Sequence, residues 1–83
     1  MVDVRQAAST ATNYLVNLYP QQTLSNVQLE EVELSEDEKY WLITLSYPVT
    51  HNLLNMQIRR EYKVFKVDAA TGQVRSMKIR KLD

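Results

Sequence analysis

The sequence has no cysteine, one glycine, two prolines and one histidine among its 83 residues. Without cysteine the chain can form neither a disulfide nor a thiolate metal site, and it has no cysteine nucleophile, so its stability must come from packing alone. The scarcity of glycine and proline, with 45% hydrophobic and 24% charged residues, is typical of a globular protein and not of a disordered or fibrous one. Because domains usually contain about 50–250 residues, we expect residues 1–83 to form a single domain.

The same scarcity limits the chemistry that the chain can perform. A zinc site would need carboxylates for every ligand besides His51, which is an unfavourable set. A serine–histidine–acid triad needs an acid that orients the histidine, and no Asp or Glu lies within nine residues of His51. The acidic stretch 30–38 lacks the alternating Asp/Asn pattern and the central glycine of a calcium-binding loop. We therefore predict no catalytic residue, no metal and no cofactor, and keep as an alternative an enzyme whose site is assembled from residues distant in sequence.

The chain also lacks a long hydrophobic run near its start. Polar and charged side chains interrupt the first twenty residues, among them Asp3, Arg5, Asn13 and Asn17. This excludes from these residues the continuous apolar stretch of a signal peptide or a membrane span. We expect a soluble chain without a membrane span, in a compartment that the residues do not identify.

The net charge is zero, yet the charges are segregated along the chain. Residues 30–38 contain six acids and no base, whereas residues 59–83 contain eight bases and three acids. If the two segments lie side by side in a sheet, opposite charges pair on its solvated face. In the alternative, the basic strands bind nucleic acid, with Tyr62 or Phe65 stacking on bases, although zero net charge argues against this. The bases are Arg59, Arg60, Lys63, Lys66, Arg75, Lys78, Arg80 and Lys81.

Residues 3–19 have the pattern of one amphipathic helix. Their apolar residues recur at steps of three and four and so share one face. Asp3 is placed to cap the first turn, and Pro20 ends the helix because a residue before proline is pushed out of the helical region. We expect the apolar face, including Tyr14, to be buried against a sheet, which its alanines allow it to approach closely. This face consists of Val4, Ala7, Ala8, Ala11, Tyr14, Leu15 and Leu18.

Residues 27–34 are expected to form the first strand, with one irregularity. The apolar positions change parity between Leu29 and Val32. A regular strand cannot place both residues on one face, because successive side chains point to opposite faces. We therefore predict a bulge near Glu30 and Glu31.

After a turn at residues 35–38, residues 40–49 alternate most regularly and are predicted to be the central strand. Trp41 is expected in the core, because large aromatic residues are mostly buried. Pro48 lacks an N–H group, so near it this strand should end or reach an edge of the sheet.

Two more strands complete the prediction. Residues 50–55 form either a loop or the end of a long hairpin, and residues 58–67 again favour a strand. The only glycine, Gly72, lies where a positive φ would close a tight turn over residues 68–72. The last strand covers residues 74–82. One helix cannot fold alone and the strands have one apolar face to bury, so we predict an α+β fold with one N-terminal helix packed on a four-stranded antiparallel sheet.

Residues 62–74, with the sequence YKVFKVDAATGQV, resemble the hairpin of PepSY domains, in which a strand closes in V-D-A-x-T-G-x-V. The leading helix and the aromatic strand at residues 40–43 are also similar to that family's order of elements, and the cystatin-like folds are similar too. The resemblance implies a small, usually non-enzymatic module. Such modules are often extracytoplasmic and sometimes attached to peptidases as regulatory or inhibitory segments. Because this is an analogy of fold, the function it implies is an expectation only.

An apolar cluster, Leu53, Leu54, Met56 and Ile58, lies where a loop would normally be polar. Either the hairpin is long and these residues fold back onto the helix, or they are exposed and form a docking surface. We predict that Leu53, Leu54 and Met56, with the flanking His51, contact a protein partner or a second copy of the chain, as in a homodimer. An edge strand offers a second mode, by strand addition from a partner.

Overall fold

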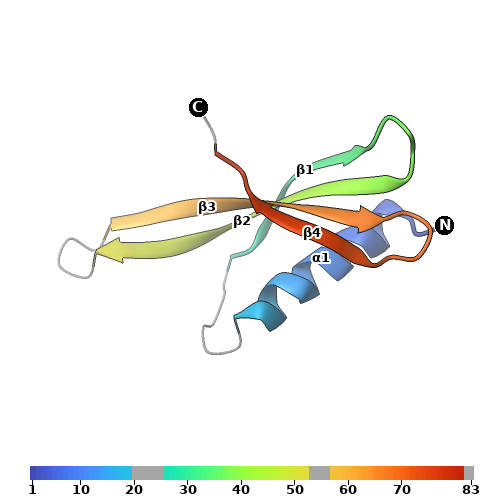
Figure 1. Cartoon of the computed structure of the whole chain (residues 1–83). Coiled ribbons are helices and arrows are strands. Elements are labelled where there is room, and N and C mark those ends of the chain that lie inside the picture. Colours follow the sequence, from blue (N-terminus) through green and yellow to red (C-terminus); the bar gives the residue numbers. More distant parts are fainter. Residues whose placement is uncertain (20–25, 53–56, 82–83) are drawn as a thin grey trace.

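The computed structural model describes residues 1–19, 26–52 and 57–81, with the backbone alone at residues 50–52 and 57–58. One helix is followed by four antiparallel strands in the spatial order β1-β2-β3-β4, and the helix lies against one side of the sheet (Figure 1). This confirms the predicted α+β fold. Among the described residues, no helix is long and apolar enough to cross a membrane. The elements are α1 (Val4–Leu18), β1 (Gln28–Leu34), β2 (Tyr40–Asn52), β3 (Gln57–Asp68) and β4 (Val74–Ile79).

Helix α1 begins with the predicted cap. The Asp3 carboxylate accepts a hydrogen bond from the backbone N–H of Gln6 at 2.8 Å, and the Gln6 side chain accepts one from the backbone N–H of Asp3 at 3.0 Å. This reciprocal pair satisfies two donors of the first turn. The buried face is narrower than predicted, because it consists of Ala7, Ala11 and Leu15.

The flanks of the predicted helix face are more exposed than expected. Val4, Tyr14 and Leu18 are each exposed to about two fifths of their surface, at 39%, 40% and 44%. The prediction that Tyr14 is a core residue was therefore wrong, although one edge of its ring packs against Phe65, with 6.1 Å between the ring centroids. The reason is that α1 is narrow, and only Ala7, Ala11 and Leu15 along its central line are fully buried against the sheet.

The bulge predicted in the first strand is present. In β1, Leu29 pairs with Leu45 and Glu31 with Thr44, so that Glu30 has no opposite residue on β2. This extra residue shifts the parity, and Leu29 and Val32 consequently point to the same face of the sheet.

Strands β2 and β3 form a long hairpin, which is one of the two arrangements predicted for this region. Their pairing runs from Tyr40 opposite Asp68 to Asn52 opposite Gln57. Pro48 is paired with Arg60 on β3, and the strand continues past it. Proline is tolerated there because the pairing with β1 stops at Ser46, opposite Gln28. The side of β2 that faces away from β3 is therefore an edge at Pro48, and the prediction that the strand reaches an edge near this residue is confirmed.

The turn between β3 and β4 is held by Asp68 and Gly72. The Asp68 carboxylate accepts hydrogen bonds from the backbone N–H groups of Ala70 and Thr71 at 2.8 and 3.0 Å, and these bonds lower its pKa. Gly72 has a φ of 80°, as the prediction of a positive φ requires. Strand β4 ends at Ile79, earlier than predicted, although the backbone N–H of Arg80 still donates to β3.

The core lies between α1 and the side of the sheet that faces it, which we call the helix face; the opposite side is the open face. Trp41 is half-buried beside this core, and its Nε1–H donates to the carbonyl oxygen of Val2 at 2.9 Å. A helix is about 10 Å wide and adjacent strands are about 4.8 Å apart, so one helix cannot cover both edges of a four-stranded sheet. The core residues are Ala7, Ala11, Leu15, Ile43, Leu45, Tyr47, Phe65 and Val67.

Candidate interaction surfaces

The residues that the sequence singled out for partner binding are only partly within the described structure. His51 belongs to β2, close to the end of the β2–β3 hairpin. Leu53, Leu54 and Met56 lie outside the described residues. In Figure 1 this end of the hairpin extends away from α1. That these side chains form a docking surface therefore stays a prediction.

The first surface that the structure adds lies on β1, and we call it the β1 margin; it consists of Leu29 and Val32. Their pairing with Leu45 and Ile43 places both side chains on the helix face, beside buried core residues. Leu29 nevertheless remains 52% exposed and Val32 37% exposed. The cause is the position of α1, which packs on β2, β3 and β4. These apolar side chains therefore lie beside the backbone edge of the sheet.

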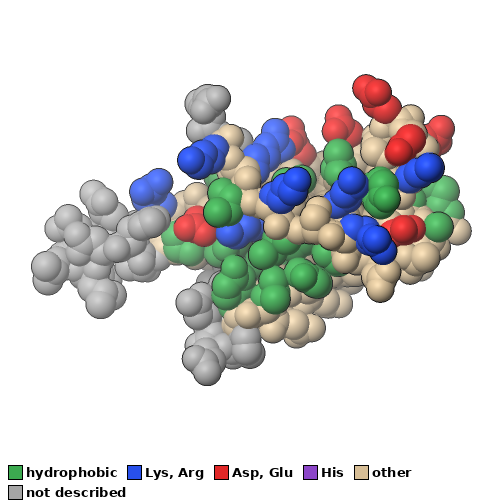
Figure 2. Space-filling view, viewed as in Figure 1, with side chains coloured by type: hydrophobic (Ala, Val, Ile, Leu, Met, Phe, Trp, Pro, Cys, Tyr) green, Lys and Arg blue, Asp and Glu red, His purple; other side chains and the backbone are tan. Residues whose placement is uncertain are grey.

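A matching surface lies at the opposite edge, and we call it the β4 margin; it consists of Tyr14, Met77 and Ile79. Met77 is paired with Phe65, the residue that the Tyr14 ring also contacts, so all three share the helix face. Ile79 follows two residues along β4 and is 70% exposed. Figure 2 shows hydrophobic side chains gathered between β4 and α1 on the visible side of the molecule. Both edges of the described sheet thus keep apolar side chains in contact with solvent.

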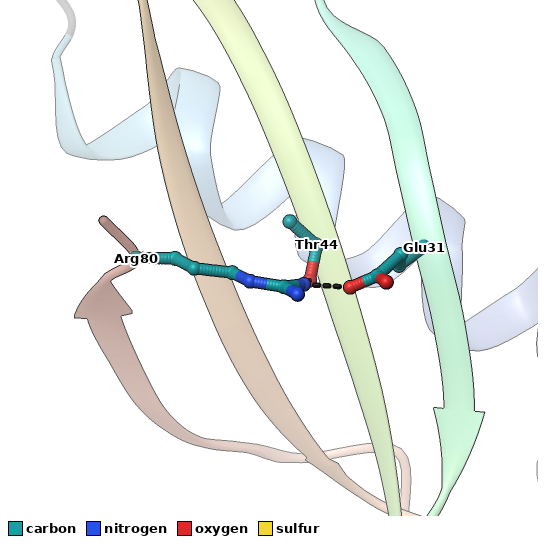
Figure 3. A network of polar contacts seen from close by, with 3 residues as sticks. All are labelled: Glu31, Thr44 and Arg80. Carbon is teal, nitrogen blue, oxygen red and sulfur yellow. Dashed lines mark hydrogen bonds and ion pairs between the residues drawn. The ribbon is translucent and has the colours of Figure 1, made fainter. Parts of the chain in front are cut away.

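The open face is polar and carries charges of both signs. Glu31 on β1 forms an ion pair with Arg80, which follows β4, and Arg80 Nη1 also donates to Thr44 Oγ1 at 3.1 Å (Figure 3). Arg80 reaches across the face from the β4 side, and Thr44 is buried beneath it. The prediction that the acidic and basic segments lie side by side was wrong, because β1 is a neighbour of neither β3 nor β4. Opposite charges nevertheless pair on the open face through this contact. It is made by a long side chain, because β1 and β4 are not neighbours.

A second group of polar contacts on the open face follows from the bulge. The Ser46 hydroxyl donates to the carboxylate of Glu30, the bulge residue, at 2.6 Å. Arg60 donates from Nε to the same hydroxyl at 3.0 Å and from Nη2 to the carbonyl oxygen of Asn26 at 2.7 Å. Ser46 is fully buried under these side chains. Two of the basic residues, Arg60 and Arg80, are therefore already held by polar partners.

A shallow groove of about 560 Å³ also lies on the open face. Its floor includes Leu42 and Val64, and its rim carries Lys66, Lys78 and Asp37. Lys66 Nζ lies 4.3 Å from the centre of the Tyr40 ring, a cation–π contact. The rim mixes both signs of charge, so the groove does not select ligands of one charge.

Tyr47 on β2 is a buried titratable group of the core. Its hydroxyl donates to Glu61 Oε2 at 3.4 Å. Burial, with Tyr19 and Glu61 close by, raises the pKa of Tyr47 to about 12. The phenol is neutral near pH 7, as an ordinary tyrosine is, and its O–H group donates to Glu61. Within residues 1–19, 26–52 and 57–81, no group of three or more His, Asp or Glu side chains is placed to hold a metal ion.

Comparison with known proteins gives no relative: no family model, no curated protein and no solved structure matches the chain. The resemblance of residues 62–74 to PepSY domains therefore stays a prediction.

Proposed function

We propose that this domain is a small, non-catalytic protein-interaction module that binds a protein through the edges of its sheet. The observation that carries the proposal is that both edge strands expose apolar side chains, Leu29 and Val32 on β1 and Ile79 on β4, on the face that the helix covers elsewhere. Single exposed apolar residues are ordinary, but a group of them beside an unpaired strand edge is a typical docking site for another strand. The backbone of the edge supplies hydrogen bonds, and the apolar side chains supply buried area.

His51, Leu53, Leu54 and Met56 remain part of this proposal as a second contact. The long β2–β3 hairpin supports it, because His51 lies near the end of a hairpin that extends away from α1. A regulatory or inhibitory role toward a peptidase, which the PepSY resemblance implies, also remains a proposal.

The alternative function, nucleic-acid binding by the basic strands, has less support. Figure 2 shows a row of basic side chains over β3 and β4, as that function would need. Two of these bases are engaged, however: Arg80 pairs with Glu31, and Arg60 binds Ser46 and Asn26. Acidic side chains within reach of the same face would also repel phosphates.

The test is a peptide selection in which the β1 margin is the variable. A random peptide library is selected on the wild-type domain, and the enriched peptides are assayed on Leu29→Thr/Val32→Thr, because threonine is a favourable strand residue at both positions. Val16→Thr is the matched control, since Val16 is 41% exposed but lies on α1, outside both margins. We expect peptides that bind the wild type and the control and lose at least tenfold in affinity on the double variant. Failure to enrich any peptide, or equal binding to all three proteins, would contradict the proposal.

A further inference from the structure

We propose that the occupant of the β1 edge is the β4 edge of a second copy of this chain, so that molecules associate head to tail and continue one sheet. This rests on the proposed function and names its partner. Three features of the described residues support it: the direction of the edge strands, the apolar side chains at the two margins, and the signs of the charges on the open face.

The strand directions permit a continuous sheet. The four strands alternate in direction, so β4 runs antiparallel to β1. A second copy that is shifted sideways places its β4 antiparallel to the first copy's β1, and its helix stays on the same side of the sheet. The regular parts of the two edges, residues 31–34 and 76–79, lie beyond the bulges and present an uninterrupted edge.

The apolar side chains at the two edges complement each other in this arrangement. A register that places Val32 opposite Ile79 places Leu34 opposite Met77, and all four side chains are on the helix face. Ile79, which is 70% exposed in the single molecule, then contacts the partly exposed Val32. The contact buries the part of the apolar sheet that one helix cannot reach.

The charges on the open face select this pairing over the symmetric ones. The same register places Glu31 opposite Arg80 and Glu33 opposite Lys78, both with opposite signs. Pairing of β1 with β1 would bring acids against acids, and pairing of β4 with β4 would bring bases against bases, which destabilises a ladder. Arg80 already forms an ion pair with Glu31 within one molecule, so a change to either residue would also disturb the single molecule. The contact between molecules is therefore tested by changing Glu33 and Lys78.

This contact uses two different surfaces, so it does not close with two molecules. A heterologous contact gives rings or open chains, and their average mass grows with protein concentration. Because the charges lie at an exposed edge, association should weaken as salt is added; the screening length is about 10 Å at 0.1 M.

The experiment measures the average mass by sedimentation velocity and light scattering over a range of concentrations at low salt. For the wild type we expect a mass that rises above the 9.7 kDa of one chain with concentration. Glu33→Lys alone and Lys78→Glu alone should each weaken association about tenfold, because each places like charges across the contact. The double variant and an equimolar mixture of the two single variants should recover it. Glu36→Lys, the same change in the turn after β1, is the control and should associate like the wild type.

Three results would overturn the inference. The first is a wild type that stays at 9.7 kDa at every concentration, and the second is a mixture of the two single variants that fails to recover association. The third is a dimer that does not grow and survives both charge reversals, which would place the contact elsewhere. If the wild type stays monomeric but still binds peptides through Leu29 and Val32, only the second-copy inference fails and the proposed function stands.

Discussion

Replacement of Gly72 by alanine tests how strongly the turn between β3 and β4 fixes this fold. Gly72 has a φ of 80°, and an added Cβ would lie 3.2 Å from Cγ2 of Val2. A non-glycine residue in this region costs about 1–2 kcal/mol, while the reduced freedom of the unfolded chain returns roughly 0.4–1 kcal/mol. The Val2 side chain must move by a few tenths of an ångström to accept the added Cβ, so the strain of the positive φ is not relieved and we expect a net loss of about 1 kcal/mol.

That loss is measurable in a domain of this size. The total free energy of unfolding should be roughly 4–12 kcal/mol, and a loss of about 1 kcal/mol lowers Tm by roughly 4–8 °C. The assay is urea and thermal unfolding followed by circular dichroism and by the fluorescence of Trp41, the only tryptophan. Gly72→Asn serves as the matched variant, because asparagine tolerates a positive φ, and it should lose less than Gly72→Ala. Equal stability of the wild type and both variants would refute the reasoning.

Three further predictions concern pH, the hairpin end and nucleic acid. Backbone hydrogen bonds lower the pKa of Asp68 in the folded state, so the ionised carboxylate stabilises the fold above pH 3.8, and this stabilisation is lost as the pH falls through the lowered pKa. Asp68→Asn should therefore make the free energy of unfolding depend less on pH in this acidic range. An unchanged pH dependence would contradict the prediction. Leu53→Ser/Leu54→Ser changes the second contact and leaves both sheet edges intact, so it should lower the average mass by less than Glu33→Lys does, with little change in Tm. A large drop in Tm would make both residues part of the core. The domain should not be retained on a DNA column at low salt; salt-dependent retention would revive the nucleic-acid alternative.

The fold could be predicted from the sequence because its local signals agree. The spacing of apolar residues in 3–19 predicted the helix, and the change of parity between Leu29 and Val32 predicted the bulge. Gly72 marked the turn, since only a glycine adopts a positive φ without cost. Each of these features depends on a few neighbouring residues, which the sequence displays directly.

The burial of individual side chains could not be predicted in the same way. Tyr14 and Ile79 both follow apolar patterns, yet one is 40% and the other 70% exposed. Their exposure depends on where one narrow helix lies over four strands, which is a property of the tertiary arrangement and not of the pattern. The hydrogen bonds of Glu30 and Arg60 to Ser46 were likewise missed, because residues from three strands meet there.

Helix α1 packs on β2, β3 and β4 but leaves Leu29 and Val32 on β1 and Ile79 on β4 exposed, and both proposals rest on this claim. Its most direct test is methyl NMR of the dilute monomer at high salt, with a soluble paramagnetic agent that broadens signals in proportion to solvent exposure. The account predicts strong broadening at Leu29, Val32 and Ile79 and weak broadening at Ile43 and Leu45. Signals of Leu29 and Ile79 as protected as that of Leu45 would contradict it.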